Sequence, residues 1–195
     1  MNPIINKSIK HSIKLKQDVL GSQIFLDMIE NTSIALTKAF QQKNQVLFCG
    51  NGGSASDAQH IAAELSGRFY FDRPPLNAEA LHVNSSYLTA VANDYSYDVI
   101  YERLVEAKGK KGDVLVGIST SGNSENVLRA LKKAKSLGMI TVALTGESGG
   151  KIAEYADFLL AVPSNDTPRI QEIHILLGHI ICEIVEKELF GHLNK

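Results

Sequence analysis

The sequence predicts an α/β fold in which a doubly wound, five-stranded parallel sheet is flanked by helices and preceded by a helical extension. Five short apolar runs are rich in branched side chains and show little polar alternation, which is typical of strands buried on both faces of a parallel sheet. Segments with helical periodicity separate these runs, and such alternation implies right-handed βαβ connections. The runs occupy residues 46–49, 80–83, 114–118, 140–144 and 158–162.

Helices are expected before and between these strands. Residues from about 8 to 43 carry apolar side chains near the helical period. Gly21 and Ser22 are expected to divide that region into two helices, with Ser22 as the N-cap of the second. Between the strands, helical patterns cover residues 55–66, 87–93, 98–107, 125–137 and 150–155.

The last expected element is a long helix over residues 168–190, and its apolar face is wide. Together with the N-terminal helices, it presents more apolar surface than one small sheet can cover, so we expect a homo-oligomer. We expect a single domain over residues 1–195, with N-terminal helices over about 1–43 and an α/β core over 44–195.

Composition excludes several classes of protein. Lysine and arginine total 20 against 21 acidic residues, a net charge of −1, so broad nucleic-acid binding is not expected. No apolar run approaches membrane-spanning length, and the start does not read as a signal peptide. Cys49 and Cys182 lie in apolar contexts, which predicts buried reduced thiols and a cytoplasmic protein.

Two strand–turn–helix junctions carry the first functional signal. Gly50 to Ser54 (GNGGS) follows the first strand, and Ser119 to Ser124 (STSGNS) follows the third. Such turns bind anions because their backbone N–H groups and the helix dipole face the ligand. Neither has the spacing or lysine of a nucleotide P-loop, and neither reads GxGxxG. Although serine and glycine are ordinary turn residues, two such turns predict a site for a phosphate monoester, with no nucleotide cofactor.

A second signal lies on the expected helices. His60 and Glu64 are four residues apart and therefore share a helix face. Such a pair can hold a metal or act as an acid/base couple, but it is also common on solvated surfaces. Gln171 and His179 lie on roughly the same side of the last helix, although a lone histidine on an apolar helix is more often structural.

Several blocks of sequence together resemble the sugar isomerase (SIS) family of phosphosugar-binding domains. The resemblance starts with GNGGS (50–54) and ISTSGNS (118–124). Further blocks are similar to the phosphoheptose isomerase family within that fold, namely SDAQHIAAELSGRF (56–69), AND (92–94), LTGESGGK (144–151) and RIQEIHILLGHIICEIVEKE (169–188).

The resemblance implies an intramolecular oxidoreductase that converts sedoheptulose 7-phosphate to D-glycero-D-manno-heptose 7-phosphate. This is the first step toward the nucleotide-activated heptoses of bacterial surface polysaccharide, such as lipopolysaccharide or capsule. It also implies a cytoplasmic homotetramer with active sites shared between subunits.

The resemblance places a catalytic acid/base pair on Glu64 and His179. A zinc site found in some members, one per subunit, matches His60, Glu64, Gln171 and His179. Zinc ligation and proton transfer compete for Glu64 and His179, and the sequence leaves both mechanisms open. Substrate contacts fall on Asn51, Gly52, Gly53, Ser54, Glu64, Asn93, Asp94, Ser119, Thr120, Ser121, Ser124 and Gln171.

Three other functions remain open at this stage. One SIS relative is a non-enzymatic scaffold that binds the bacterial replication initiator, and others sense phosphosugars without converting them. A different phosphosugar isomerase is the third. Glu64 and His179, the acid/base positions, favour the enzyme over the scaffold.

Overall fold

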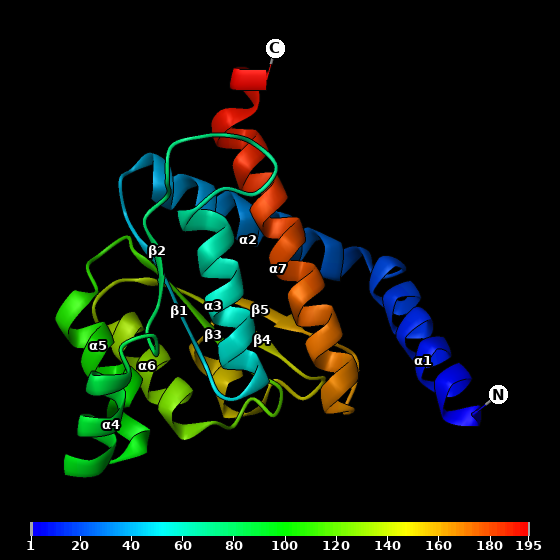
Figure 1. The fold of residues 1–195 in the computed structure, drawn as a ribbon, viewed down its shortest axis with the longest axis horizontal. Helices are drawn as coiled ribbons and strands as arrows, with labels where there is room; N and C mark the ends of the chain where they lie inside the picture. Colours follow the sequence, from blue (N-terminus) through cyan, green and yellow to red (C-terminus); the bar gives the residue numbers. More distant parts are fainter. Residues whose placement is uncertain (1, 195) are drawn as a thin grey trace.

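The computed structural model describes residues 2–194 and contains one five-stranded, all-parallel sheet with helices on both faces (Figure 1). The strand order is β2-β1-β3-β4-β5, so the predicted fold class is confirmed. The strands are β1 (Val46–Gly50), β2 (Ala78–Ala80), β3 (Val114–Ser119), β4 (Ile140–Thr145) and β5 (Phe158–Ala161).

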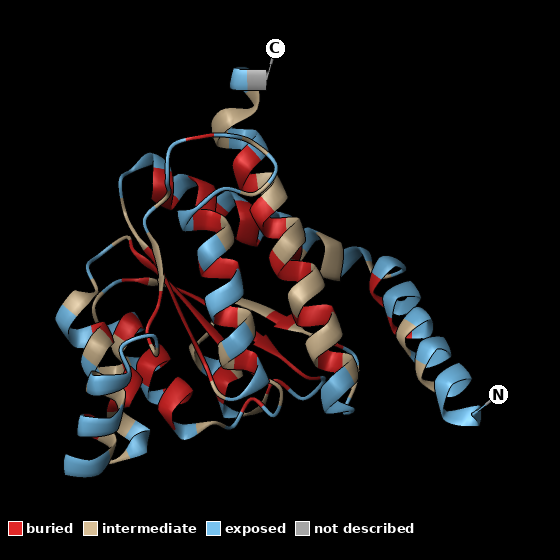
Figure 2. Cartoon of the chain, viewed as in Figure 1, coloured by how far each residue is buried: buried red, intermediate tan, exposed pale blue. Residues whose placement is uncertain are grey.

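Side-chain alternation along the strands divides the core into two halves. Val46 and Phe48 of β1 face one half, whereas Leu47 and Cys49 face the other. The central strands β1, β3 and β4 are buried almost throughout (Figure 2). The first half is covered by α1 (Pro3–Leu20), α2 (Gln23–Gln41), α3 (Gly53–Ser66) and α7 (Thr167–Phe190). The second is covered by α4 (Ser85–Asp94), α5 (Ile100–Lys108) and α6 (Glu125–Ser136).

The two N-terminal helices begin at side-chain caps. Ser22 is the N-cap of α2, as predicted, and its Oγ accepts a bond from the N–H of Phe25. The first helix starts at Pro3, earlier than expected, after Asn2 accepts from the N–H of Ile4. Proline is favoured at the first helical position because its missing N–H would have no partner there.

Three elements differ from the sequence prediction. The second strand covers Ala78–Ala80 rather than 80–83, and Val83 is half exposed, so the apolar run overestimated burial at this sheet edge. The helix expected at 98–107 begins as a 3-10 turn over Tyr97–Val99. The segment Gly150–Tyr155 is a 3-10 helix, not an α-helix.

The strand order creates a crevice at the carboxyl edge of the sheet. The helices that follow the neighbouring strands β1 and β3 diverge, because α3 packs on one face and α6 on the other. In open α/β sheets, ligands bind at such a switch point. Both glycine- and serine-rich turns lie at this edge, one after β1 and the other after β3.

Two other sequence expectations concern the thiols and membranes. Cys49 and Cys182 are buried free thiols, and burial raises the pKa of each to about 12. Among residues 2–194, no helix combines the length and hydrophobicity that crossing a bilayer requires.

Candidate functional site

The helices at the crevice begin without side-chain caps. Gly52, which has no side chain, is the N-cap of α3, with φ +55°. Ser124 is the N-cap of α6, and its side chain accepts no bond from the helix. The helices α1, α2 and α4 are capped by side chains, whereas α5 and α7, like α3 and α6, are not.

In α3 the N–H groups of Ser54 and Ala55 bond to carbonyls of the turn, and in α6 the N–H of Val127 bonds to Oδ1 of Asn126. Among the described residues, this leaves the N–H of Gly53 in α3 and those of Glu125 and Asn126 in α6 available to an anion.

Hydroxyl groups line the second turn. Oγ of Ser119 lies 2.9 Å from Oγ of Ser124 and 3.5 Å from Oγ of Ser121. Ser119 is almost fully buried and Ser121 is exposed, so the cluster extends from the sheet into solvent. Thr120 lies between them, and its carbonyl accepts a bond from the N–H of Gly146. Converging hydroxyls of this kind can donate to phosphate oxygens.

A pair of amides joins the two turns. The Nδ2 of Asn51 donates to Oδ1 of Asn126, and the reverse bond is also 2.9 Å long. The hydroxyl of Tyr97 donates to Oδ1 of Asn51 as well. Because Asn126 is buried at the start of α6, this pair sets the spacing between the GNGGS and STSGNS turns.

A third turn, which contains Gly149 and Gly150, packs against the STSGNS turn. Gly122 has φ +63°, and a β carbon there would lie 2.1 Å from the carbonyl oxygen of Gly149. A β carbon on Gly150, whose φ is +55°, would lie 2.4 Å from the carbonyl oxygen of Gly122. Only residues without side chains allow this backbone contact, which accounts for the glycines at positions 122 and 150.

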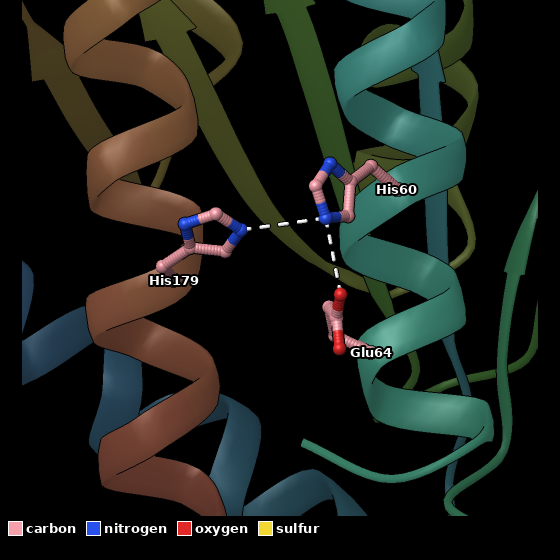
Figure 3. Close-up of side chains that lie close together, drawn as sticks. All are labelled: His60, Glu64 and His179. Atoms are coloured by element: carbon pink, nitrogen blue, oxygen red, sulfur yellow. Dashed lines mark hydrogen bonds and ion pairs between the residues drawn. The ribbon is translucent and has the colours of Figure 1, made fainter. Parts of the chain in front are cut away.

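His60, Glu64 and His179 form a cluster between α3 and α7 (Figure 3). The Nε2 of His60 lies 3.0 Å from Oε1 of Glu64 and 3.4 Å from Nε2 of His179. The exposed fractions of the His60 and Glu64 side chains are 48% and 25%, so a small molecule can reach them. The structure thus brings together the predicted pair on α3 and the predicted histidine on α7.

The cluster has the dimensions of a zinc site. Its three ligand atoms lie within 4.8 Å of one another. Bonds of about 2.0–2.1 Å from a tetrahedral zinc ion place neighbouring ligand atoms roughly 3.3–3.4 Å apart. Two imidazole nitrogens and a carboxylate oxygen are a common catalytic zinc set, so the residues present fit this metal.

Gln171 lies against the GNGGS turn. A β carbon on Gly53 would lie 2.6 Å from Nε2 of Gln171, so the amide occupies the space that a side chain there would need. This contact joins the second turn of α7 to the first turn of α3. Ser54, the next residue of α3, is buried behind the turn.

Known proteins resemble this chain over nearly its whole length. The SIS domain family matches residues 22–146. A phosphoheptose isomerase from Clostridium acetobutylicum is 53% identical over 191 residues, which cover 98% of this chain and 97% of that protein. The chain belongs to the phosphoheptose isomerase family of SIS domain proteins.

Solved structures of the phosphoheptose isomerase family share the fold. The protein from Neisseria gonorrhoeae has a TM-score of 0.88 at 43% identity and covers 94% of this chain and 97% of its own. The protein from Francisella tularensis has a TM-score of 0.91 at 36% identity, covering 96% and 100%.

Asn93 and Asp94 bond to each other rather than to the other residues of the expected site. They are exposed at the end of α4, where Nδ2 of Asn93 donates to Oδ1 of Asp94. Within residues 2–194, no hydrogen bond joins either side chain to the other expected site residues. Their substrate contacts stay a prediction.

Sequence reasoning missed Asp57, on the same helix as His60 and Glu64. The Oδ2 of Asp57 is buried and, among the described residues, has no hydrogen-bond partner. Burial raises the pKa of this carboxyl, and the nearby imidazoles of His60 and His179 oppose that shift. Residues 57, 60 and 64 are spaced three and four apart, which places them on one face of a helix. This spacing could have identified Asp57 from the sequence.

Proposed function

We propose that this chain is an aldose–ketose isomerase that converts sedoheptulose 7-phosphate to D-glycero-D-manno-heptose 7-phosphate, the first step in making nucleotide-activated heptoses for bacterial surface polysaccharide. One observation carries the proposal. An acid/base cluster on α3 and α7 occurs together with two helices, α3 and α6, that begin without side-chain caps, in a member of the phosphoheptose isomerase family.

The turns bind the substrate's phosphate in this proposal. The N–H groups at the starts of α3 and α6 and the hydroxyls of Ser119, Ser121 and Ser124 donate to its oxygens. Binding the phosphate at one end of the sugar holds the reacting carbons at a constant distance from the cluster. Such positioning lowers the entropic part of the barrier.

Proton transfer is assigned to the cluster. Glu64 removes a proton from the carbon beside the carbonyl and returns it to the neighbouring carbon, through an enediol. His179 moves the second proton between the two oxygens, because imidazole exchanges protons near neutral pH. The two groups come from different helices, Glu64 from α3 and His179 from α7 (Figure 3).

A zinc ion fits the same cluster. His60, Glu64 and His179 would hold it, and we propose Gln171 as a further ligand. Bound zinc supplies Lewis-acid polarisation of the two substrate oxygens. Glu64 then serves as base only where its carboxylate remains free to accept a proton, so metal dependence is part of the test.

We further propose that the chain is a single SIS domain acting as a cytoplasmic homotetramer whose active sites are shared between subunits. The exposed apolar residues of α1 support association, since isolated monomers seldom present such a stripe to water. The free buried cysteines support a reducing compartment.

The test is an assay with sedoheptulose 7-phosphate in deuterated water, on protein whose zinc content has been measured. We expect aldose product with deuterium on the carbon next to its carbonyl. Glu64→Gln should abolish turnover while substrate binding stays within about threefold of wild type, because the amide cannot accept the proton.

Ser121→Ala is the matched variant, and it should mainly raise KM, because it removes a phosphate donor and leaves the cluster intact. A chelator that stops wild-type turnover would make zinc part of the mechanism. Substrate binding without any product, with and without added zinc, would instead favour a scaffold or sensor.

A further inference from the structure

A buried ion pair lies behind the cluster. Nε of Arg73 donates to Oε1 of Glu186 at 2.9 Å, and the exposed fractions of the two side chains are 0% and 1%. Removing two charges from water costs several kcal/mol per ion unless further hydrogen bonds compensate. A pair held this deeply therefore depends on the groups around it.

The carboxylate of Glu186 binds the loop that follows α3. It accepts bonds from the N–H groups of Phe69, Tyr70 and Phe71, at 3.0, 2.7 and 3.1 Å. These bonds hold the pKa of Glu186 below its usual range, although burial opposes that shift. Three successive N–H groups are thus fixed to one carboxylate on α7.

The guanidinium of Arg73 binds the end of α3. Nη2 donates to the carbonyl of Glu64 at 2.9 Å, and Nη1 donates to the carbonyl of Leu65 at 2.8 Å. The last carbonyls of a helix lack intrahelical partners and favour a cation. Arg73 therefore fixes the backbone of Glu64 itself.

Phe69 connects the loop held by Glu186 to His179 of the cluster. Its ring is stacked on the imidazole of His179, with centroids 5.7 Å apart and an interplanar angle of 23°. Glu186, which accepts the bond from the N–H of Phe69, lies on α7 two turns after His179. The backbone of Glu64 and the ring of His179 are thus both set by one buried pair.

We propose that Arg73 and Glu186, acting partly through Phe69, are positioning residues that hold Glu64 and His179 in register for proton transfer. The inference rests on the proposed isomerase function. None of the three needs to touch the reacting carbons, so their effect is on turnover more than on substrate affinity.

The decisive variant is Phe69→Leu, because it removes the stacked ring and leaves the ion pair in place. We expect kcat to fall about 10- to 100-fold, the range that follows misplacement of a catalytic group, with KM within about twofold. Phe69→Tyr keeps a ring and should restore kcat.

Phe71→Leu is the matched control. Phe71 also donates its N–H to Glu186, yet among residues 2–194 no ring contact joins it to His179. Its kcat should match wild type. Equal kcat values for the Phe69→Leu and Phe71→Leu variants, or a raised KM with unchanged kcat, would overturn the proposal.

A spectroscopic measurement tests the same contact without turnover. The imidazole protons of His179, assigned by their absence in His179→Gln, should move downfield in Phe69→Leu, because the ring current of Phe69 is lost. They should move in Glu186→Gln as well, and not in Phe71→Leu. Unmoved resonances in Phe69→Leu would refute the positioning role, whereas an inactive wild type with shifted resonances would refute only the isomerase function.

Discussion

At the scale of single residues, His174 is a histidine that the mechanism does not use. It is fully buried on α7, and its Nε2 donates to the carbonyl oxygen of Thr145 at the end of β4. Burial lowers the pKa of His174 to about 4, although the bond to Thr145 opposes the shift. The ring is therefore neutral in the folded protein near pH 7 and links α7 to the sheet.

This burial predicts a loss of stability in mild acid. Below about pH 6.5 the unfolded chain binds a proton at His174 that the folded chain binds only near pH 4. Folding should thus weaken as pH falls through this window, by about 3 kcal/mol in total.

His174→Gln is the variant that tests the effect, since it keeps an N–H donor and does not titrate. Denaturant unfolding at pH 7 and pH 4, at one protein concentration, should show the larger loss in wild type. Parallel losses in the two proteins would mean that His174 is not responsible.

At the scale of elements, the cluster depends on how closely α3 and α7 pack. Gly178 precedes His179, and a β carbon there would lie 2.4 Å from Cδ1 of Ile61, the residue after His60. The glycine therefore permits the helix approach that brings the two imidazoles within 3.4 Å.

Gly178→Ala should push the helices apart. Overpacking costs about 1–3 kcal/mol, and turnover should fall because Glu64 and His179 separate. Adding Ile61→Ala should recover part of both losses, so the double variant should lose less than the two single variants combined. Gly191→Ala is the control, since nothing lies within 4 Å of a β carbon there. Full additivity, measured by unfolding and kcat, would exclude a direct clash.

The sequence could predict features that depend on nearby residues, but not contacts between residues far apart in the chain. Continuous apolar runs located four strands within one residue, whereas the edge strand β2 was misplaced because burial there is incomplete. His60 and Glu64 are only four residues apart, so their spacing indicated that they share one face of a helix. Asn126 contacts Asn51 and Phe69 contacts His179, about 75 and 110 residues away. Local sequence patterns do not predict contacts at such separations.

At the scale of the whole molecule, α1 extends away from the body of the domain (Figure 1). Only its last turns reach the core, through Leu15 and Val19. Ile5, Ile9 and Ile13 are 50–55% exposed and, four residues apart, form one stripe. Such a stripe on an extended helix favours packing against another copy of the chain.

Replacing Ile9 and Ile13 together by lysine should therefore dissociate the proposed oligomer. Two charges in an apolar contact would be desolvated without partners, which association cannot compensate. Sedimentation velocity should show a monomer, and circular dichroism should show native helix content. Turnover should drop at least tenfold if subunits share active sites. Lys7→Glu, on the opposite side of α1, should change neither property. A double variant that remains oligomeric would show that this stripe is not the interface, whereas a monomer with full turnover would place the active site within a single chain.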